Sequence, residues 1–477
     1  GFSVEVYIAM LFWNAPAACT AANGGDAGPG ETDHGNVAII AANPLAASLD
    51  SAARAHVEST TVPGVSVAVV RGGETLLQAG YGFVDLEWDV PAPADGSASY
   101  EIGSVTKQFT TAAVLDLAGE GLVDLDADFT EYVDFRTGGR TVSVRRLMDH
   151  TSGIRGYTEM EVFGSLTPFD LPKDTLVRLV EAQPFDFEPG YAQIYNNSAF
   201  FLLGLIIEEV TGRRYDVVVQ ERLFEPAGMD ASYYCDELAI RVGRANGYDQ
   251  AGADSLIRAR HLDHAWPYSA GSLCSTVGDL VAWNAALHGG ALLDDGSYTE
   301  MTTPAPLADG VPIRYGMGIG VDSAFGQPVL RHGGGINGFL SSLAWYPDAE
   351  LTVAVLQNST GNPGPGQLAD VLAELVLGPA PQMDAVPFEG DLAQLVGTYR
   401  GPARGITLTV RVTAADGELA IDNSLRGGDA VRPEHRGGLR WDDDGGMRYL
   451  FEPSGARAER LRIDVGSGHY VLTRVAG

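Results

Sequence analysis

The hydrophobic pattern changes between helical and strand-like spacing along most of the chain. Helical spacing over residues 45–58 is followed by two apolar, strand-like runs, at 65–70 and 76–84, which the turn Gly72-Gly73 joins. From residue 104 to 290 helical and loop signals dominate, and the clearest helical segments are 144–148, 175–182, 198–210 and 279–287. Strand signals return at 315–321, 329–332, 340–346 and 351–356, and a helix is predicted at 367–377. Strands on both sides of a helical middle predict an α/β domain whose sheet carries a large helical insertion.

The last part of the chain has a different pattern. Residues 378–387 are rich in proline and alanine, which is typical of a linker. Short runs of alternating apolar and polar residues follow, most clearly at 407–412, and evenly spaced short strands predict a small antiparallel barrel. We therefore divide the chain into a main domain at 44–380, a linker at 381–390 and an all-β domain at 391–477. We expect the all-β domain to fold on its own.

Residues 1–43 are expected to precede the first domain as a signal remnant or a disordered lead-in. The apolar run from Val6 to Trp13 and the following Ala15-Pro16-Ala17 resemble the end of a secretory signal, which favours a secreted or periplasmic protein. The match is incomplete, because no basic residue precedes the run and Glu5 adjoins it. An arbitrary start of the chain is the alternative. Residues 20–43 are rich in glycine, alanine and acidic residues, a composition typical of disorder.

Composition narrows the classes of function. The 477 residues carry a formal net charge of −31, which repels phosphate backbones and excludes a nucleic-acid partner. No apolar run approaches the roughly 18 residues of a membrane-spanning helix. Three cysteines are too few for a disulfide scaffold, although Cys235 and Cys274 could pair. His261 and His264 lack an evident third ligand for a zinc ion.

Lysine is rare in this chain. Of 31 lysines and arginines, only Lys107 and Lys173 are lysines. A lysine can lose its proton near neutral pH in a suitable site, whereas arginine cannot. A lysine in a chain that otherwise uses arginine therefore indicates a role in proton transfer. Lys107 ends the motif Ser104-Val105-Thr106-Lys107, where the pattern turns helical. Residues three apart share a helix face, so the amine would lie beside the serine hydroxyl and activate it.

Two further segments supply groups that acyl transfer needs. In Tyr195-Asn196-Asn197, the phenol of Tyr195 can act as a base near a lysine, and the amide of Asn197 can hold Lys107 or the substrate. In His332-Gly333-Gly334-Gly335, the glycines let the backbone approach a substrate closely. We expect the backbone N–H groups of Ser104 and Gly335 to form an oxyanion hole.

Other interpretations of these motifs are weaker. Tyr-Asn-Asn alone is commonly a helix cap. Glycines 333, 335 and 338 match G-x-G-x-x-G, but a strand is predicted where a dinucleotide-binding helix would have to begin. The chain contains no G-x-S-x-G, which argues against an α/β-hydrolase.

The order and spacing of the three motifs resemble those of the serine β-lactamase and penicillin-binding-protein superfamily, which carries S-x-x-K, Y-x-N and K/H-x-G in this order. Residues 147–154 and 270–279 resemble the family's L-x-x-H-T-S-G and A-G-G-L-x-S-T-x-x-D segments. The resemblance extends over about residues 44–380 and is closest to the class C branch, with its esterases and D-amino-acid peptidases. It implies an antiparallel sheet flanked by helices, and Gly397-Thr398-Tyr399 resembles the lipocalin-like barrel of some members.

The resemblance implies a serine hydrolase that forms an acyl-enzyme on Ser104, with Lys107 and Tyr195 as proton carriers. Asn197 and residues 332–335 would bind the substrate and the oxyanion. Two departures bear on the substrate: His332 stands where many β-lactamases have lysine, and Gly333 stands where the family usually has threonine or serine. The missing hydroxyl removes a group that helps to hold a substrate carboxylate.

Several functions therefore remain open. The absence of a hydroxyl at position 333 favours a carboxylesterase-like enzyme, and a D-amino-acid-specific peptidase, DD-peptidase or β-lactamase is the alternative. A non-hydrolysing acyl-binding sensor would keep the fold but would not need the whole catalytic set. We expect no cofactor and no metal, and a small molecule or short peptide as the substrate. The sequence leaves the oligomeric state open.

Overall fold

The computed structural model describes residues 39–40, 44–236, 238–381, 384–423 and 430–475. The signal-like run and the composition-based lead-in lie almost entirely outside these residues. The exception is β1 (Ile39–Ile40), which pairs with Leu77 and Gln78. This end of the expected lead-in is therefore part of a sheet.

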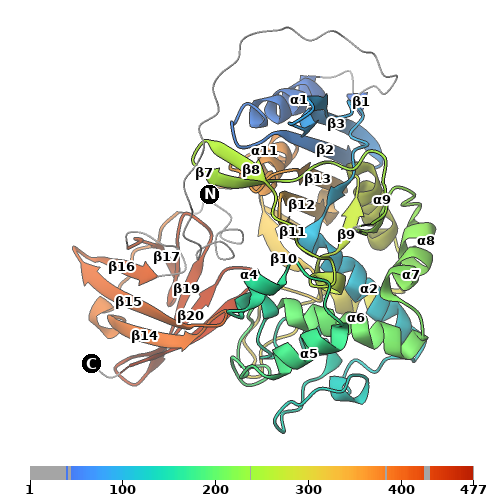
Figure 1. Ribbon diagram of the computed structural model, residues 1–477. Coiled ribbons are helices and arrows are strands. Elements are labelled where there is room, and N and C mark those ends of the chain that lie inside the picture. Colours follow the sequence, from blue (N-terminus) through green and yellow to red (C-terminus); the bar gives the residue numbers. More distant parts are fainter. Residues whose placement is uncertain (1–38, 41–43, 237, 382–383, 424–429, 476–477) are drawn as a thin grey trace.

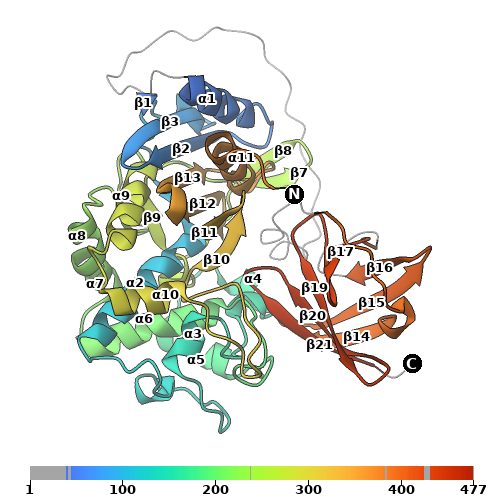
Figure 2. The same cartoon turned by 180° about the vertical axis from the view of Figure 1, so that it is seen from behind.

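The main sheet is antiparallel throughout, as the family resemblance implies. Its strands run in the order β1-β3-β2-β13-β12-β11-β10 (Figures 1 and 2), and β4 (Val90–Pro91) pairs with the far end of β3. The other strands are β2 (Gly64–Arg71), β3 (Glu74–Asp85), β10 (Gly320–Ala324), β11 (Gln327–Ile336), β12 (Phe339–Tyr346) and β13 (Leu351–Gln357). The first hairpin is thus completed by strands that lie far along the sequence.

Alternate residues of the central strands enter two separate cores. Val67 and Val69 of β2 pack with α1 (Pro44–His56) and α11 (Pro365–Leu377), which cover one face. Ala68 belongs to the larger core under the helical insertion on the other face. A strand that is buried on both sides reads as a continuous apolar run, and this explains the sequence of β2.

The insertion holds most of the helices, as the sequence predicts. They are α2 (Thr106–Gly119), α3 (Val144–Met148), α4 (Phe163–Leu166), α5 (Lys173–Glu181), α6 (Asn197–Thr211), α7 (Tyr215–Val219), α8 (Glu225–Ala227), α9 (Val277–His288) and α10 (Asp295–Thr302). Short strands accompany them: β5 (Tyr100–Glu101), β6 (Tyr233–Tyr234) and β9 (Leu273–Ser275), with the separate hairpin of β7 (Tyr248–Gly252) and β8 (Ser255–Arg258). A disulfide joins Cys235 to Cys274, the pair that the sequence left open.

The strand predicted at 315–321 is wrong for most of its length, because β10 begins only at Gly320. Just before β10, backbone N–H groups form hydrogen bonds with residues outside the sheet. Met317 N–H donates to the carbonyl of Met301, and Gly318 N–H donates to that of Met148. An apolar run with glycines can satisfy its backbone in a loop, so alternation alone does not identify a strand here.

Eight antiparallel strands form a curled C-terminal sheet, which we call the half-barrel. They are β14 (Gly397–Pro402), β15 (Thr407–Ala415), β16 (Glu418–Asn423), β17 (Glu434–Gly437), β18 (Arg440–Asp442), β19 (Arg448–Ser454), β20 (Arg457–Asp464) and β21 (His469–Arg474). Leu408, Val410 and Val412 of β15 point inward and their neighbours are exposed, which confirms the predicted alternation.

The core of the half-barrel includes residues of the main domain. Phe187, Ala192 and Ile194, which precede α6, are buried in the same cluster as the apolar residues of its strands. Gln193 pairs with His469 through two backbone hydrogen bonds of 3.1 and 2.8 Å, and Arg314 forms a 2.8 Å ion pair with Asp464. The two parts of the chain therefore share a continuous contact.

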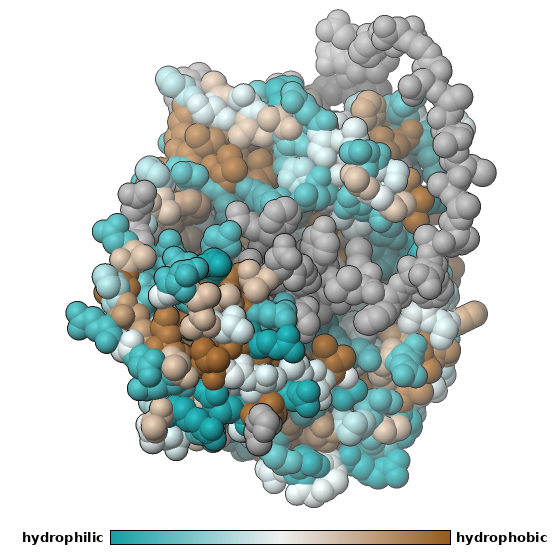
Figure 3. All heavy atoms as spheres, turned by 90° about the vertical axis from the view of Figure 1, so that its left-hand side faces the viewer, coloured by the Kyte–Doolittle hydropathy of each residue, from teal (hydrophilic) through white to brown (hydrophobic). Residues whose placement is uncertain are grey.

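Seen from the left of Figure 1, hydrophilic and hydrophobic side chains are interspersed over the surface (Figure 3). Among the helices of the described residues, none is both long and apolar enough to cross a bilayer.

Candidate active site

Ser104 lies in a single 3₁₀ turn, Gly103–Val105, that leads directly into α2. Gly103 has a positive φ of 49°, and a Cβ atom there would lie 2.8 Å from the backbone nitrogen of Gly335. Only glycine lets these two backbones approach so closely. The turn thus places Ser104 at the start of a helix and against β11, as the predicted oxyanion hole requires.

Lys107 lies one turn after Ser104 and is completely buried. Its Nζ atom is 3.1 Å from Oγ of Ser104, 2.8 Å from Oδ1 of Asn197 and 2.8 Å from the carbonyl oxygen of Ala270. The structure therefore brings Ser104, Lys107 and Asn197 together. It adds the carbonyl of Ala270, which sequence reasoning missed because a backbone acceptor leaves no sequence signal.

The amide of Asn197 and the carbonyl of Ala270, which accept hydrogen bonds from Lys107, are held in place by the surrounding elements. Asn197 is the first residue of α6, whose start is capped by the side chain of Asn196, which accepts a hydrogen bond from Ala199 N–H. The segment after Ala270 is tied to α2, because Leu273 N–H donates to Oγ1 of Thr106. Lys107 is thus held between α2, α6 and the 3₁₀ turn Tyr268–Ala270.

Burial holds the pKa of Lys107 well below its usual value, and the positive charge of Arg404 lowers this pKa further. The three oxygen atoms that contact Nζ belong to a hydroxyl, an amide and a carbonyl. None of the three carries the negative charge that would stabilise the ammonium form. The site favours a neutral amine, which arginine could not provide.

Tyr195 lies between the side chains of Lys107 and Arg404. Nζ of Lys107 is 4.8 Å from the centre of its ring, and Cζ of Arg404 is 5.7 Å from it. The ring also packs against His150 at 4.4 Å, and His150 Nδ1 accepts a hydrogen bond from Asn196 N–H. His150 thus has the structural role of a buried hydrogen-bonded group in a tight turn, and burial holds its pKa well below the usual value.

The glycine segment occupies the end of β11. β10 pairs with β11 only from Gln327 to Arg331, whereas β12 pairs with it as far as Ile336. Gly333 and Gly335 are consequently at least partly exposed. Among the described residues, β10 does not pair with β11 beyond Arg331, so a substrate backbone could hydrogen-bond to this edge of β11.

His332 and Arg331 point to opposite sides of β11, as alternation predicts. His332 is buried, its Nε2 lies 2.9 Å from the hydroxyl of Tyr315, and burial lowers its pKa to about 3. The histidine is therefore neutral at physiological pH. Arg331 is exposed and lies 3.5 Å from Asp322, so it offers no cation on the side of His332.

Arg404 is a further site residue that sequence reasoning missed. It comes from the turn between β14 and β15 of the half-barrel, and its side chain is only 15% exposed. Its Nε donates to Oε1 of Glu159 at 2.8 Å. Its position beside Tyr195 depends on how two distant parts of the chain pack, and no local motif marks it.

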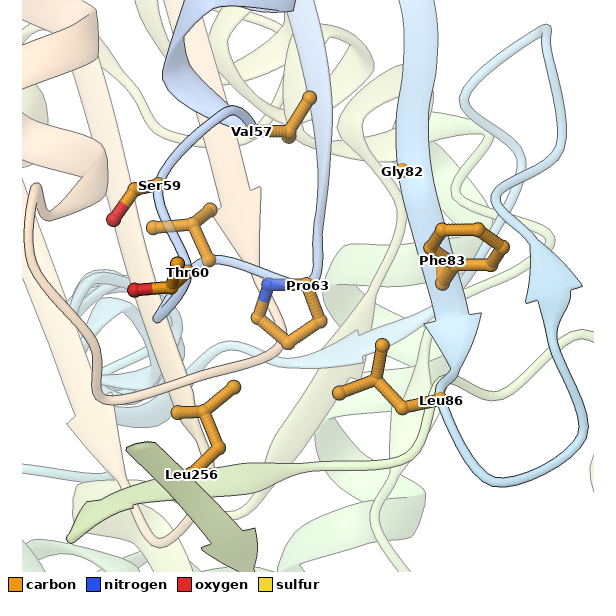
Figure 4. A pocket seen from close by; sticks show the side chains of 9 residues that line it. Val57, Ser59, Thr60, Pro63, Gly82, Phe83, Leu86 and Leu256 are labelled. Atoms are coloured by element: carbon orange, nitrogen blue, oxygen red, sulfur yellow. The ribbon is translucent and has the colours of Figure 1, made fainter. Parts of the chain in front are cut away.

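Two other features contribute nothing to this site. Figure 4 shows a pocket between the α1–β2 connection, β3 and β8; its lining is mainly apolar and includes Pro63, Phe83, Leu86 and Leu256, but not Ser104 or Lys107. His264 is held by Ser272 at 3.0 Å, and no cluster of three metal-ligating side chains occurs among the described residues.

A family model described as beta-lactamase matches residues 49–377. The chain belongs to the beta-lactamase family of serine hydrolases. This beta-lactamase-family chain is 30% identical over 350 residues to the D-aminopeptidase of Brucella ovis. The match covers 73% of the chain but 65% of the relative, so the chain spans less than two thirds of the length of the curated relatives that it matches.

Solved structures agree with the family fold. A D-stereospecific amidohydrolase from Streptomyces sp. is 27% identical with a TM-score of 0.59, and the match covers 69% of this chain and 98% of that one. The octameric penicillin-binding protein homologue from Pyrococcus abyssi is 23% identical with a TM-score of 0.62. That match covers 89% of this chain and 99% of the other, so it extends beyond the main domain.

Proposed function

We propose that the protein hydrolyses amide bonds on the carboxyl side of D-amino acid residues, through an acyl-enzyme on Ser104. The observation that carries the proposal is the 3.1 Å contact between Ser104 Oγ and the buried Nζ of Lys107. The choice of substrate is supported by the identity of 30% to a D-aminopeptidase and of 27% to a D-stereospecific amidohydrolase.

The contacts of Lys107 explain how Ser104 would lose its proton. A neutral lysine amine has two N–H donors and one lone pair. Asn197 Oδ1 and the Ala270 carbonyl accept the two donors, which leaves the lone pair directed at the hydroxyl of Ser104. The proton passes to this amine, and the nearby phenol of Tyr195 shares the proton transfer.

The remaining steps use the same groups. Oγ of Ser104 attacks the substrate carbonyl carbon, and the developing oxyanion accepts hydrogen bonds from the N–H groups of Ser104 and Gly335. The C–N bond then breaks, and the leaving amine takes the proton from Lys107 or Tyr195. Water attacks the acyl ester, gives one proton back to this pair, and Ser104 recovers its hydroxyl as the free acid leaves.

A substrate panel tests the proposal. We expect the purified protein to hydrolyse D-phenylalanine amide and D-alanine p-nitroanilide, with kcat/KM at least about a hundredfold above that for the L-enantiomers. Ser104→Ala is the matched control and should hydrolyse neither compound. Equal rates for the two enantiomers would contradict the proposed D-specificity, and turnover by Ser104→Ala would contradict the proposed nucleophile.

A carboxylesterase activity is the second candidate, and Gly333 is the residue that favours it. The segment 332–335 supplies backbone N–H groups and a neutral imidazole, but no hydroxyl to hold a substrate carboxylate. p-Nitrophenyl butyrate therefore belongs in the same panel. Hydrolysis of the butyrate ester without hydrolysis of either D-amide would support the esterase. Labelling of Ser104 without any turnover would support an acyl-binding sensor.

A further inference from the structure

The half-barrel places one charged side chain at the catalytic groups. Arg404 lies in the turn between β14 and β15, where its Nε and one terminal nitrogen contact Glu159 at 2.8 and 2.5 Å. A terminal nitrogen of its guanidinium also donates to Oγ1 of Thr158 at 3.3 Å. Its Cζ is 5.7 Å from the centre of the Tyr195 ring.

The position of this turn is fixed by its surroundings. Ala403 is buried in the core of the half-barrel, and its N–H donates to the carbonyl of Ile406 at 2.9 Å. Gly405 has a positive φ of 67°, and a Cβ atom there would lie 2.7 Å from Cβ of Glu159. The turn thus packs directly against Glu159, which pairs with Arg404, and only glycine fits at position 405.

We propose that Arg404 is a positioning residue, through which the half-barrel sets the protonation of Lys107 and Tyr195. The proposal rests on the function proposed above, because it assigns these two residues the transfer of protons. Glu159 acts together with Arg404, since it holds the guanidinium in place and partly offsets its charge.

A second charged pair lies next to Arg404 and Glu159: Arg155 and Asp186 form an ion pair at 2.6 Å, Asp186 faces Glu159 and Gly405, and burial raises the pKa of Asp186 to about 6. His150, at the end of α3, and His332, on β11, face Lys107, and burial lowers the pKa of both. Both imidazoles are therefore neutral near pH 7. Tyr157 faces Tyr195 from the insertion, and burial raises its pKa well above the usual value. Tyr470 of β21 also faces Arg404.

The charge of Arg404 also acts on Lys107 in the expected direction. It lowers the pKa of the amine, in addition to the larger effect of burial. A lower pKa makes more of the neutral amine available near pH 7, where it must accept the proton of Ser104. Loss of Arg404 would leave the carboxylate of Glu159 near the site, and both changes raise the pKa of Lys107.

Two variants should therefore move the pH dependence in opposite directions. In Arg404→Gln, the acid limb of the pH profile should shift to higher pH by about half a unit or more. In Glu159→Gln, the uncompensated guanidinium should shift this limb to lower pH. Arg404→Lys keeps the charge and should stay near the wild type, and so should Arg411→Met, which removes an exposed arginine of β15.

The measurement is the rate of Ser104 labelling by a fluorophosphonate as a function of pH, in the full chain, followed by intact mass. This probe does not depend on the substrate class. Opposite shifts in the two Gln variants support the proposal. Shifts in the same direction, or unshifted profiles at a lowered rate, would overturn it and leave Arg404 a purely structural role. Absence of labelling in the wild type would overturn the proposed function as well.

Discussion

Oδ1 of Asn197 lies 2.8 Å from Nζ of Lys107, although the two residues open different helices. This contact joins the Ser-x-x-Lys turn to the Tyr-Asn-Asn segment. Asn197 and the carbonyl of Ala270 occupy two of the hydrogen-bonding positions of the amine. The remaining position faces the hydroxyl of Ser104. The geometry of the nitrogen therefore depends on two acceptors that carry no charge.

Replacing Asn197 by aspartate tests this dependence on neutral acceptors. A carboxylate at 2.8 Å from Nζ would stabilise the ammonium form and raise the pKa of Lys107. Because the proposed mechanism uses the neutral amine, the acid limb of the kcat/KM profile should shift to higher pH, with activity at pH 7 reduced and partly recovered at alkaline pH. Asn197→Ser is the uncharged control, and an identical pH profile for the two variants would contradict the argument.

The two lysines of the chain offer a matched pair of substitutions. Lys107→Arg keeps a positive charge but removes a group that can lose its proton, so we expect kcat/KM to fall at least about a hundredfold. Lys173→Arg is the control, because Lys173 forms an ion pair with Glu208 at 2.7 Å in which arginine can serve equally well. Near-normal activity of Lys107→Arg would show that Lys107 does not transfer a proton and has only a structural role.

Ser104→Ala should abolish both fluorophosphonate labelling and turnover. Its thermal unfolding midpoint should remain close to that of the wild type, since Ser104 is only partly buried and the hydrogen-bond contact of its hydroxyl is with Lys107, at 3.1 Å. Peptide mapping of the wild-type adduct provides the check. An adduct on any other serine would show that the nucleophile has been assigned wrongly.

The sequence predicted the elements whose residues are buried in a regular pattern. The helix at 144–148 and the strands β12 and β13 appear where expected, because alternation and helical spacing report which face of an element is buried. Ser104 and Lys107 were also predictable, because three residues of helix bring them into contact whatever the rest of the chain does.

The parts that the sequence could not predict depend on contacts between distant segments. Arg404 is one of many arginines, and only the docking of the half-barrel brings it to Tyr195. The carbonyl of Ala270 is a backbone atom, which every residue has. The apolar Phe187 and Ile194 looked like ordinary core residues of the main domain, yet they lie in the core of the half-barrel.

Gly333 offers a test of substrate choice. Gly333→Thr would introduce at this position the hydroxyl that the family usually has there, in register with Ser342 of β12. A hydroxyl donor stabilises a substrate carboxylate, so the variant should hydrolyse a chromogenic cephalosporin faster relative to p-nitrophenyl butyrate than the wild type does. We expect the wild type to hydrolyse the cephalosporin slowly or not at all. A wild-type kcat/KM for the cephalosporin at or above that for butyrate would show that another group binds the carboxylate.

The half-barrel gives the last prediction, and here the structure changes the expectation drawn from the sequence. The linker composition alone favours a main domain that stays soluble and reactive when the chain ends near residue 380. In the structure, that truncation would expose Phe187, Ala192 and Ile194 and would remove the two backbone hydrogen bonds of Gln193.

Ile194 directly precedes Tyr195, so the loss of the half-barrel should disturb the very segment that carries this tyrosine, and it also removes Arg404. We therefore expect the truncated chain to be labelled at Ser104 at least about tenfold more slowly than the full chain, even where circular dichroism shows that its helices persist. Arg314→Met is the milder variant, because it breaks the ion pair with Asp464 but leaves Arg404 in place. It should be labelled at nearly the wild-type rate. Full labelling of the truncated chain would mean that the main domain holds Tyr195 in place without help, and that the shared core serves stability alone.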